Sequence, residues 1–175
     1  QGAKIDAFGV GERLITAKSD PVFGGVYKLV AIEKDGDILP KIKISENTEK
    51  ITNPGFKKVC RLFSNESKEA IADVITLFDE TIDESKPYEI FDPEHTWKRK
   101  TVSNFTVEEI TQQIYKKGKR IYKTPDVHEI KKHCEREVGR LWDEVKRFEF
   151  PHKYYVDLSP KLWSLKDELL KKYSR

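Results

Sequence analysis

The stretch IDAFGVGERLITAKSDPVFGGVYKLV, residues 5–30, is the most informative part of the sequence for predicting the fold. Its first four residues, Ile5 to Phe8, are mostly apolar and end at a glycine, which suits a buried strand, although so short a run also suits a helical turn. Gly9-Val10-Gly11 follows, and glycine allows both positive φ and close approach of a ligand to the main chain. A strand leading into Gly-x-Gly is therefore able to present N–H groups to an anion.

A second glycine pair, Gly24-Gly25, leads into the apolar run Val26 to Val30. The alternative interpretation is that both glycine sets are ordinary turns. Spacing alone favours the turns, because short glycine motifs often arise by chance.

Length and composition indicate a polar-surfaced chain of one domain or two small ones. The 175 residues include 33 Lys and Arg against 30 Asp and Glu, for a net charge of +3, and the mean hydropathy is -0.67. The two signs are mixed along the chain, which is a weak basis for a nucleic-acid partner. No apolar run reaches the length of a membrane span and no signal-peptide core is present, so we expect a soluble cytoplasmic protein.

The sulfur-containing residues bear on the compartment and on the extent of the chain. Cys60 and Cys134 lie far apart, so neither a disulfide framework nor a zinc ribbon is predicted, and each is expected to be a small buried hydrophobe. The sequence has no methionine. We therefore expect a part of a longer protein, with N-terminal processing as the alternative.

Two antiparallel ribbons are predicted in the first half. Asp35-Gly36 between the alternating runs 27–33 and 38–45 is typical of a hairpin, and the apolar runs 58–63 and 70–78 predict a second one. The acidic connector Asp79 to Pro87 is the best internal boundary. It divides the chain into residues 1–87 and 88–175.

The second half is predicted to hold a hairpin with a basic tip at residues 116–119 and then two helices. Thr124 with Pro125 is a good start for the first helix, which is expected to run to Pro151. Ser159-Pro160 begins the second. The helices' predicted buried stripes are Val127, Ile130, Cys134, Val138, Leu141, Val145 and Phe148 in the first, and Leu162, Leu165, Leu169 and Tyr173 in the second, with Trp142 and Trp163 packed between them.

No catalytic constellation is visible in the chain. His128 and His133 are five residues apart, whereas ligands on one helical face need a spacing of three or four, so no metal site is predicted. The basic and aromatic cluster at Trp97 to Lys100 would suit single-stranded nucleic acid, but acidic residues intervene and no RNA-binding motif is present.

Several motifs in order resemble the bacterial nicotinate phosphoribosyltransferases, and the resemblance covers nearly the whole chain. They are DAFGVG and GGVYKLV within residues 5–30, PKIKISE at 40–46, ITNPGFKKV at 51–59, FDPEHTWKRK at 91–100 and LWDEVKRFEFPHKYYVDLS at 141–159. The resemblance implies the C-terminal portion of such an enzyme. The implied fold class is α+β, a fragment of an irregular type II phosphoribosyltransferase α/β barrel with antiparallel β ribbons and a C-terminal two-helix subdomain.

The activity that the resemblance implies is an ATP-coupled ligase reaction of NAD biosynthesis. Nicotinate and 5-phosphoribosyl 1-pyrophosphate give nicotinate mononucleotide and pyrophosphate, and the full enzyme is expected to use ATP and Mg²⁺ and to form a homodimer. The glycines would bind the ribose 5-phosphate through backbone N–H groups, at Gly9, Val10, Gly11, Gly24 and Gly25.

The resemblance assigns no catalytic residue to this chain, because the family's phosphorylated histidine and its catalytic acid belong to segments upstream of Gln1. This polypeptide alone is therefore expected to be inactive and to bind no cofactor or metal. The alternative is a noncatalytic structural or protein-interaction module, and neither interpretation includes nucleic acid or a membrane.

Overall fold

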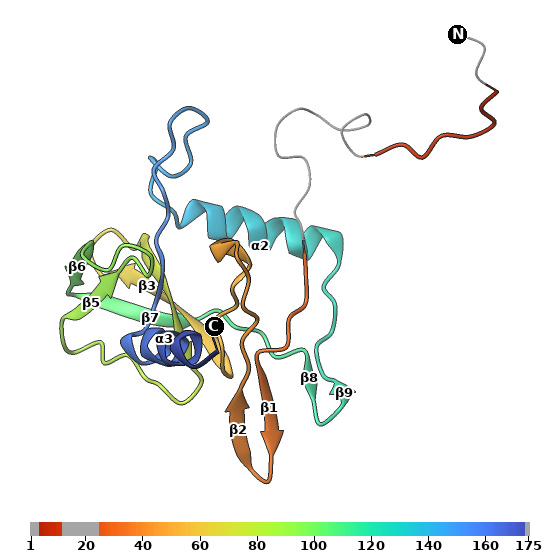
Figure 1. Cartoon of the computed structure of the whole chain (residues 1–175). Coiled ribbons are helices and arrows are strands. Elements are labelled where there is room, and N and C mark those ends of the chain that lie inside the picture. The colour runs from red at the N-terminus through yellow and green to blue at the C-terminus, as the bar shows by residue number, and fades with distance from the viewer. Residues whose placement is uncertain (1–3, 12–24, 174–175) are drawn as a thin grey trace.

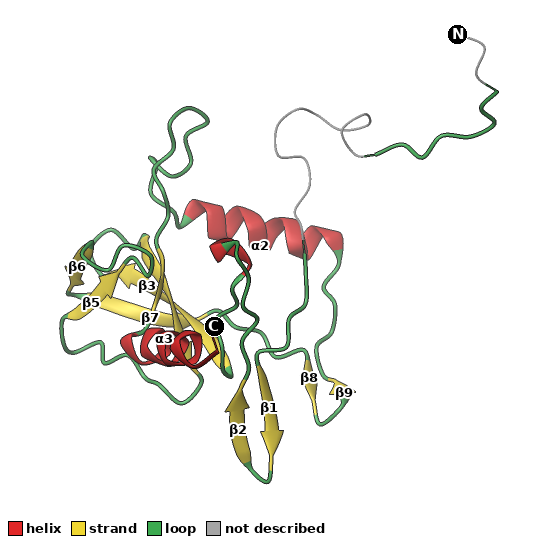
Figure 2. Cartoon of the chain, viewed as in Figure 1, coloured by secondary structure: helices red, strands yellow, loops and turns green. Residues whose placement is uncertain are grey.

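The fold is built on a four-stranded sheet in a computed structural model that describes residues 4–11 and 25–173. The strand order is β10-β4-β3-β7, and the strands are β3 (Lys57–Ser64), β4 (Ala70–Leu77), β7 (Phe105–Glu109) and β10 (Val156–Leu158). β3 is antiparallel to both β4 and β7, and β10 is parallel to β4. Figure 1 shows this sheet with α3 beside it. The architecture is mixed α and β with few helices among the described residues, as Figure 2 shows.

The predicted second ribbon is confirmed as β3 and β4, and it forms the centre of the core. Their register places Cys60 opposite Val74 and Leu62 opposite Ala72, so these side chains share one face. The hairpin of β5 (Tyr88–Phe91) and β6 (Arg99–Val102) contributes further apolar side chains. The core consists of Cys60, Leu62, Ala72, Val74, Ile82, Ile90, Val102 and Phe105. Its members come from both before and after residue 87. The division of the chain at that point stays a prediction.

The other two predicted hairpins are confirmed, with shorter strands than expected. β1 (Ala31–Lys34) and β2 (Asp37–Pro40) are joined at Asp35 and Gly36, whose φ angles of 54° and 88° fit a tight hairpin turn. The second strand ends at Pro40 and not at residue 45, because the chain then turns toward the short 3₁₀ helix η1 (Thr48–Lys50). β8 (Tyr115–Lys116) and β9 (Lys119–Arg120) form the hairpin with the basic tip.

The strand predicted at Ile5 to Phe8 is wrong for this structure. The segment has no regular secondary structure, and Ile5 and Phe8 are 55% and 76% exposed. Figure 1 shows it running clear of the other elements. An isolated strand has no neighbour to accept its hydrogen bonds, so an apolar pattern alone cannot make it one.

The first predicted helix is shorter and more exposed than the sequence suggested. α2 covers Val127–Gly139, and its N-cap is Asp126 rather than Thr124, because the Asp126 carboxylate accepts hydrogen bonds from the N–H groups of His128 and Glu129. The predicted buried stripe is wrong: none of the residues in α2 is buried, and Cys134 is exposed. Phe148, expected within the helix, lies in the following loop and is fully exposed.

The second predicted helix is confirmed as α3 (Pro160–Tyr173), although only part of its stripe is buried. The Ser159 hydroxyl accepts from the N–H of Leu162, which is fully buried, whereas Tyr173 is 55% exposed. The prediction that Trp142 and Trp163 pack between the two helices is wrong. Trp142 stacks on Tyr154 and Trp163 meets the edge of Phe91. No helix among the described residues is long and apolar enough to cross a membrane.

Candidate functional site

The predicted phosphate-binding glycines lie on open main chain. A Cβ atom added at Gly9, Gly11 or Gly25 would meet nothing within 4 Å, and Val10 is exposed. Gly24 lies outside the described residues. Within residues 4–11 the main chain forms no hydrogen bond to any other described residue, so its N–H groups are accessible to a ligand. The assignment of these glycines to a phosphate stays a prediction.

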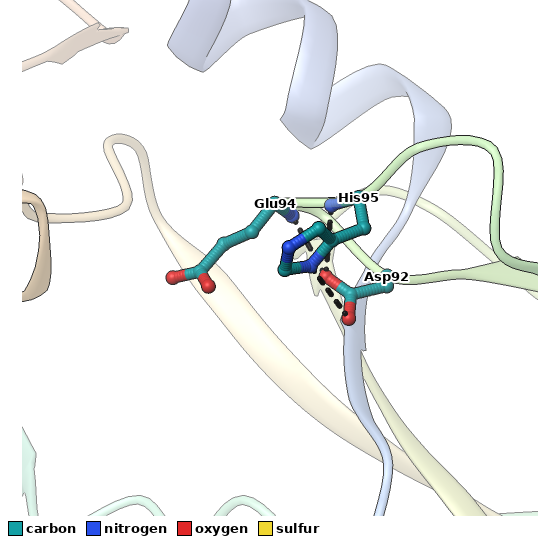
Figure 3. Close-up of side chains that lie close together, drawn as sticks. All are labelled: Asp92, Glu94 and His95. Carbon is teal, nitrogen blue, oxygen red and sulfur yellow. Dashed lines mark hydrogen bonds and ion pairs between the residues drawn. The ribbon is translucent and has the colours of Figure 1, made fainter.

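A cluster of polar side chains lies in the loop between β5 and β6, and Figure 3 shows its three members. Asp92, Glu94 and His95 each offer a ligand atom, and these atoms lie within 4.8 Å of one another. Asp92 Oδ1 accepts from the N–H groups of Glu94 (2.9 Å) and His95 (3.1 Å), and Oδ2 lies 3.4 Å from His95 Nδ1. The ring of Trp97 meets the His95 ring edge-on at 5.1 Å between centroids. Both contacts restrict the orientation of the imidazole.

Asp157 is a buried acid near this cluster. It lies on β10, is 4% exposed, and faces a cavity of about 190 Å³ that Asp92 also lines. Burial, and secondly the charge of Asp92, raise the pKa of Asp157 to about 6. The Asp157 carboxylate accepts no hydrogen bond from the side chains and main chain that the structure describes.

A charged network lies on the face of the sheet opposite to the one that carries Cys60 and Val74. Arg61 and Asp73 are register partners on β3 and β4, and two hydrogen bonds of 2.7 and 2.9 Å join the guanidinium to the carboxylate. Tyr154 donates to Asp73 at 2.9 Å, and Arg61 Nη1 donates to Glu137 of α2 at 3.1 Å. The hydrogen bonds to Asp73 raise the pKa of Arg61, and burial raises the pKa of Tyr154. This network attaches α2 to the sheet.

Two larger cavities lie elsewhere on the molecule. A polar one of about 470 Å³ between α2 and the sheet is lined by residues of both signs, including Arg61, Glu108 and Arg136, so it favours neither an anion nor a cation. An apolar one of about 460 Å³ lies where the β1–β2 hairpin approaches α3, beside the stacked rings of Phe56 and Phe78.

The spacing between histidines does not point to this cluster, because it contains one histidine and two carboxylates. The signal was the run Asp92-Pro93-Glu94-His95, in which the proline favours a turn. The sequence did not predict that Asp157 lies near Asp92, because the two approach only when β10 joins the sheet beside β4.

Comparison with known proteins first gives the class. Residues 56–166 match the family model described as "Nicotinate phosphoribosyltransferase C-terminal domain". The chain is also similar in fold to the crystal structure of human nicotinic acid phosphoribosyltransferase, with a TM-score of 0.64 at 24% identity, over 90% of this chain and 30% of that one.

Curated relatives give the particular family. The chain is 43% identical to the nicotinate phosphoribosyltransferase of Bacillus subtilis over 166 residues, which are 95% of this chain and 34% of that protein. It is 35% identical to the Caenorhabditis elegans enzyme over 167 residues, 93% of this chain and 28% of that protein. The chain belongs to the nicotinate phosphoribosyltransferase family, and it spans about a third of the length of these relatives.

Proposed function

We propose that this chain is the C-terminal part of a nicotinate phosphoribosyltransferase of NAD biosynthesis. The complete enzyme would form nicotinate mononucleotide and pyrophosphate from nicotinate and 5-phosphoribosyl 1-pyrophosphate, with ATP hydrolysis. The observation that carries the proposal is the 43% identity to the Bacillus subtilis enzyme over 95% of the chain. A cytoplasmic location belongs to the same proposal.

In this proposal, Ile5 to Phe8 pairs as a late strand of a type II phosphoribosyltransferase barrel only in the complete enzyme, where neighbouring strands would be present. The strand-like pattern of a segment that has no partner among the described residues supports it. Because barrel active sites lie at the C-terminal ends of the strands, Gly9, Val10 and Gly11 would then bind the 5-phosphate, with Gly24 and Gly25 nearby. The accessible N–H groups at Gly9, Gly11 and Gly25 are suitable donors for such an anion.

ATP and Mg²⁺ belong to the complete enzyme in this proposal. Residues 9–11 offer main-chain N–H donors and no side-chain oxygen, which suits phosphate and not Mg²⁺. We assign no Mg²⁺ to them. This chain contributes phosphate binding and structural contacts, and it is inactive by itself.

Two measurements test this proposal. The isolated chain should form no nicotinate mononucleotide from the two substrates and ATP, and turnover would contradict the assignment of the catalytic groups elsewhere. In the complete enzyme, Gly11→Val should raise the KM for 5-phosphoribosyl 1-pyrophosphate, because Cβ atoms crowd the bound phosphate. Gly139→Val at the end of α2 is the matched control, because an added Cβ there also meets nothing within 4 Å and its φ is not positive. Unchanged kinetics in Gly11→Val would make these glycines ordinary turns.

The second candidate is a noncatalytic interaction module, which the exposed apolar side chains of α2 favour. Val127, Ile130 and Val138 are 70%, 49% and 46% exposed. A homodimer contact would cover them. Deletion of residues 88–175 cannot separate the two functions, because it removes β7 and β10 from the sheet. Ile130→Glu can: loss of the dimer with unchanged KM values favours the interaction role, and a raised KM favours the catalytic one.

A further inference from the structure

The loop between β5 and β6 holds a set of side chains with the composition of a metal site. Asp92 and Glu94 offer carboxylate oxygens, and His95 offers an imidazole nitrogen, within 4.8 Å of one another (Figure 3). Bound Zn²⁺ lies about 2.0–2.2 Å from such atoms, so neighbouring ligand atoms are separated by about 3–4 Å. Glu94 is exposed and forms no hydrogen bond through its side chain with the described residues, so its rotation can supply the remaining approach.

Asp157 provides an independent observation that points to a cation. Asp157 is 4% exposed as a residue, lines the same cavity as Asp92, and accepts no hydrogen bond from the described residues. Buried carboxylates are normally paired or hydrogen-bonded, because desolvation disfavours an isolated charge. Lys98, Arg99 and Lys100 also line the cavity. None of these three forms an ion pair with Asp157 or Asp92, and Arg99 instead pairs with Glu89.

We propose that Asp92, Glu94 and His95 bind a divalent zinc-type ion. The nitrogen ligand favours Zn²⁺ over Mg²⁺ and Ca²⁺, which prefer sites made only of oxygen ligands. Asp157 is a positioning residue, whose charge acts on the site through Asp92, with which it shares a cavity. The ion would hold the β5–β6 loop, which is already attached to α3 through the bond from Trp163 Nε1 to the carbonyl of Pro93 (3.3 Å).

Titration calorimetry with ZnCl₂ on the 175-residue chain tests the site. Every protein carries Cys134→Ser, because this exposed thiol is itself a zinc ligand. Asp92→Asn keeps the acceptor for the two N–H groups and removes the charge, and His95→Phe keeps the ring contact with Trp97. The matched controls are Asp83→Asn, from a similar turn in which Oδ1 accepts from the N–H of Ser85, and His128→Phe on α2.

One Zn²⁺ should bind per chain. Asp92→Asn, Glu94→Gln and His95→Phe should each weaken binding at least about tenfold, and Asp157→Asn by a smaller factor. The controls should bind as the parent does, and Mg²⁺ and Ca²⁺ at least about tenfold more weakly than Zn²⁺.

Three results would overturn the proposal: no binding by the parent, binding unchanged in His95→Phe, or Mg²⁺ binding as tight as that of Zn²⁺. Circular dichroism verifies that each variant is folded. If Asp92→Asn or His95→Phe unfolds, the exposed Glu94→Gln carries the decision, because its side chain forms no hydrogen bond with the described residues that its loss would break.

Discussion

Removing either partner of the ion pair between Arg61 and Asp73 should strongly destabilise the described fold. Their side chains are 15% and 10% exposed, and the carboxylate also accepts a hydrogen bond from Tyr154. Removing one member leaves the other largely buried without its main partner, which costs about 3–5 kcal/mol. For a chain of this size each kcal/mol lowers Tm by about 2–4 °C, so Arg61→Met should lower Tm by roughly 6–20 °C.

A double-mutant cycle measured by urea denaturation separates the pair from its surroundings. Arg61→Met and Asp73→Leu should each be strongly destabilising, and the double variant should lose less than the sum of the two, with a coupling of about 2 kcal/mol or more. The control is Lys86→Met, which breaks the ion pair of Lys86 and Asp83, whose side chains are 76% and 50% exposed. It should leave Tm nearly unchanged. Equal effects of Arg61→Met and Lys86→Met would refute the reasoning.

Three further predictions concern local structure and pH. Asp126→Ala removes the capping box of α2 and should cost about 1 kcal/mol, seen as lost helical circular dichroism; an unchanged spectrum would contradict the cap. Gly55→Ala should destabilise the fold by roughly 2 kcal/mol or more, because φ is +88° and the new Cβ meets Leu77 Cδ2 at 2.8 Å. The control is Gly36→Ala, which has the same φ in open space and should cost less. A larger loss of stability in Gly36→Ala would exclude the contact with Leu77 as the cause. Burial lowers the pKa of Lys57 from 10.5 to about 8, so the unfolded chain binds more protons between these values. The free energy of unfolding should therefore rise with pH from about 8 to 10, and Lys57→Met should reduce this slope in urea titrations.

Local patterns predicted those elements whose stability is local. The Asp35-Gly36 hairpin forms because both residues adopt the positive φ that the turn requires, and α3 begins where the Ser159 hydroxyl caps it. The ribbon of β3 and β4 follows from two apolar runs joined by a short polar turn. In each case the groups that hydrogen-bond the backbone lie on the same element or on the next one along the chain.

Patterns failed where a partner must come from elsewhere. Ile5 to Phe8 has the composition of a strand, but no described residue pairs with it. The stripe of α2 has the periodicity of a core helix, and yet Val127 and Ile130 are 70% and 49% exposed. Periodicity shows that a face is apolar, and it does not show what covers that face.

The sequence by itself determined the family, through motifs spread over the chain. It also determined the local elements whose ends are set by turns and helix caps. Tertiary structure alone decided that β10 would lie parallel to β4, which buries Asp157 beside the loop of Asp92 and His95. It also decided that Arg61 would face Asp73 across two strands. The physical reason is that pairing between distant strands depends on the burial and hydrogen bonding of the whole sheet, which no local stretch of sequence contains.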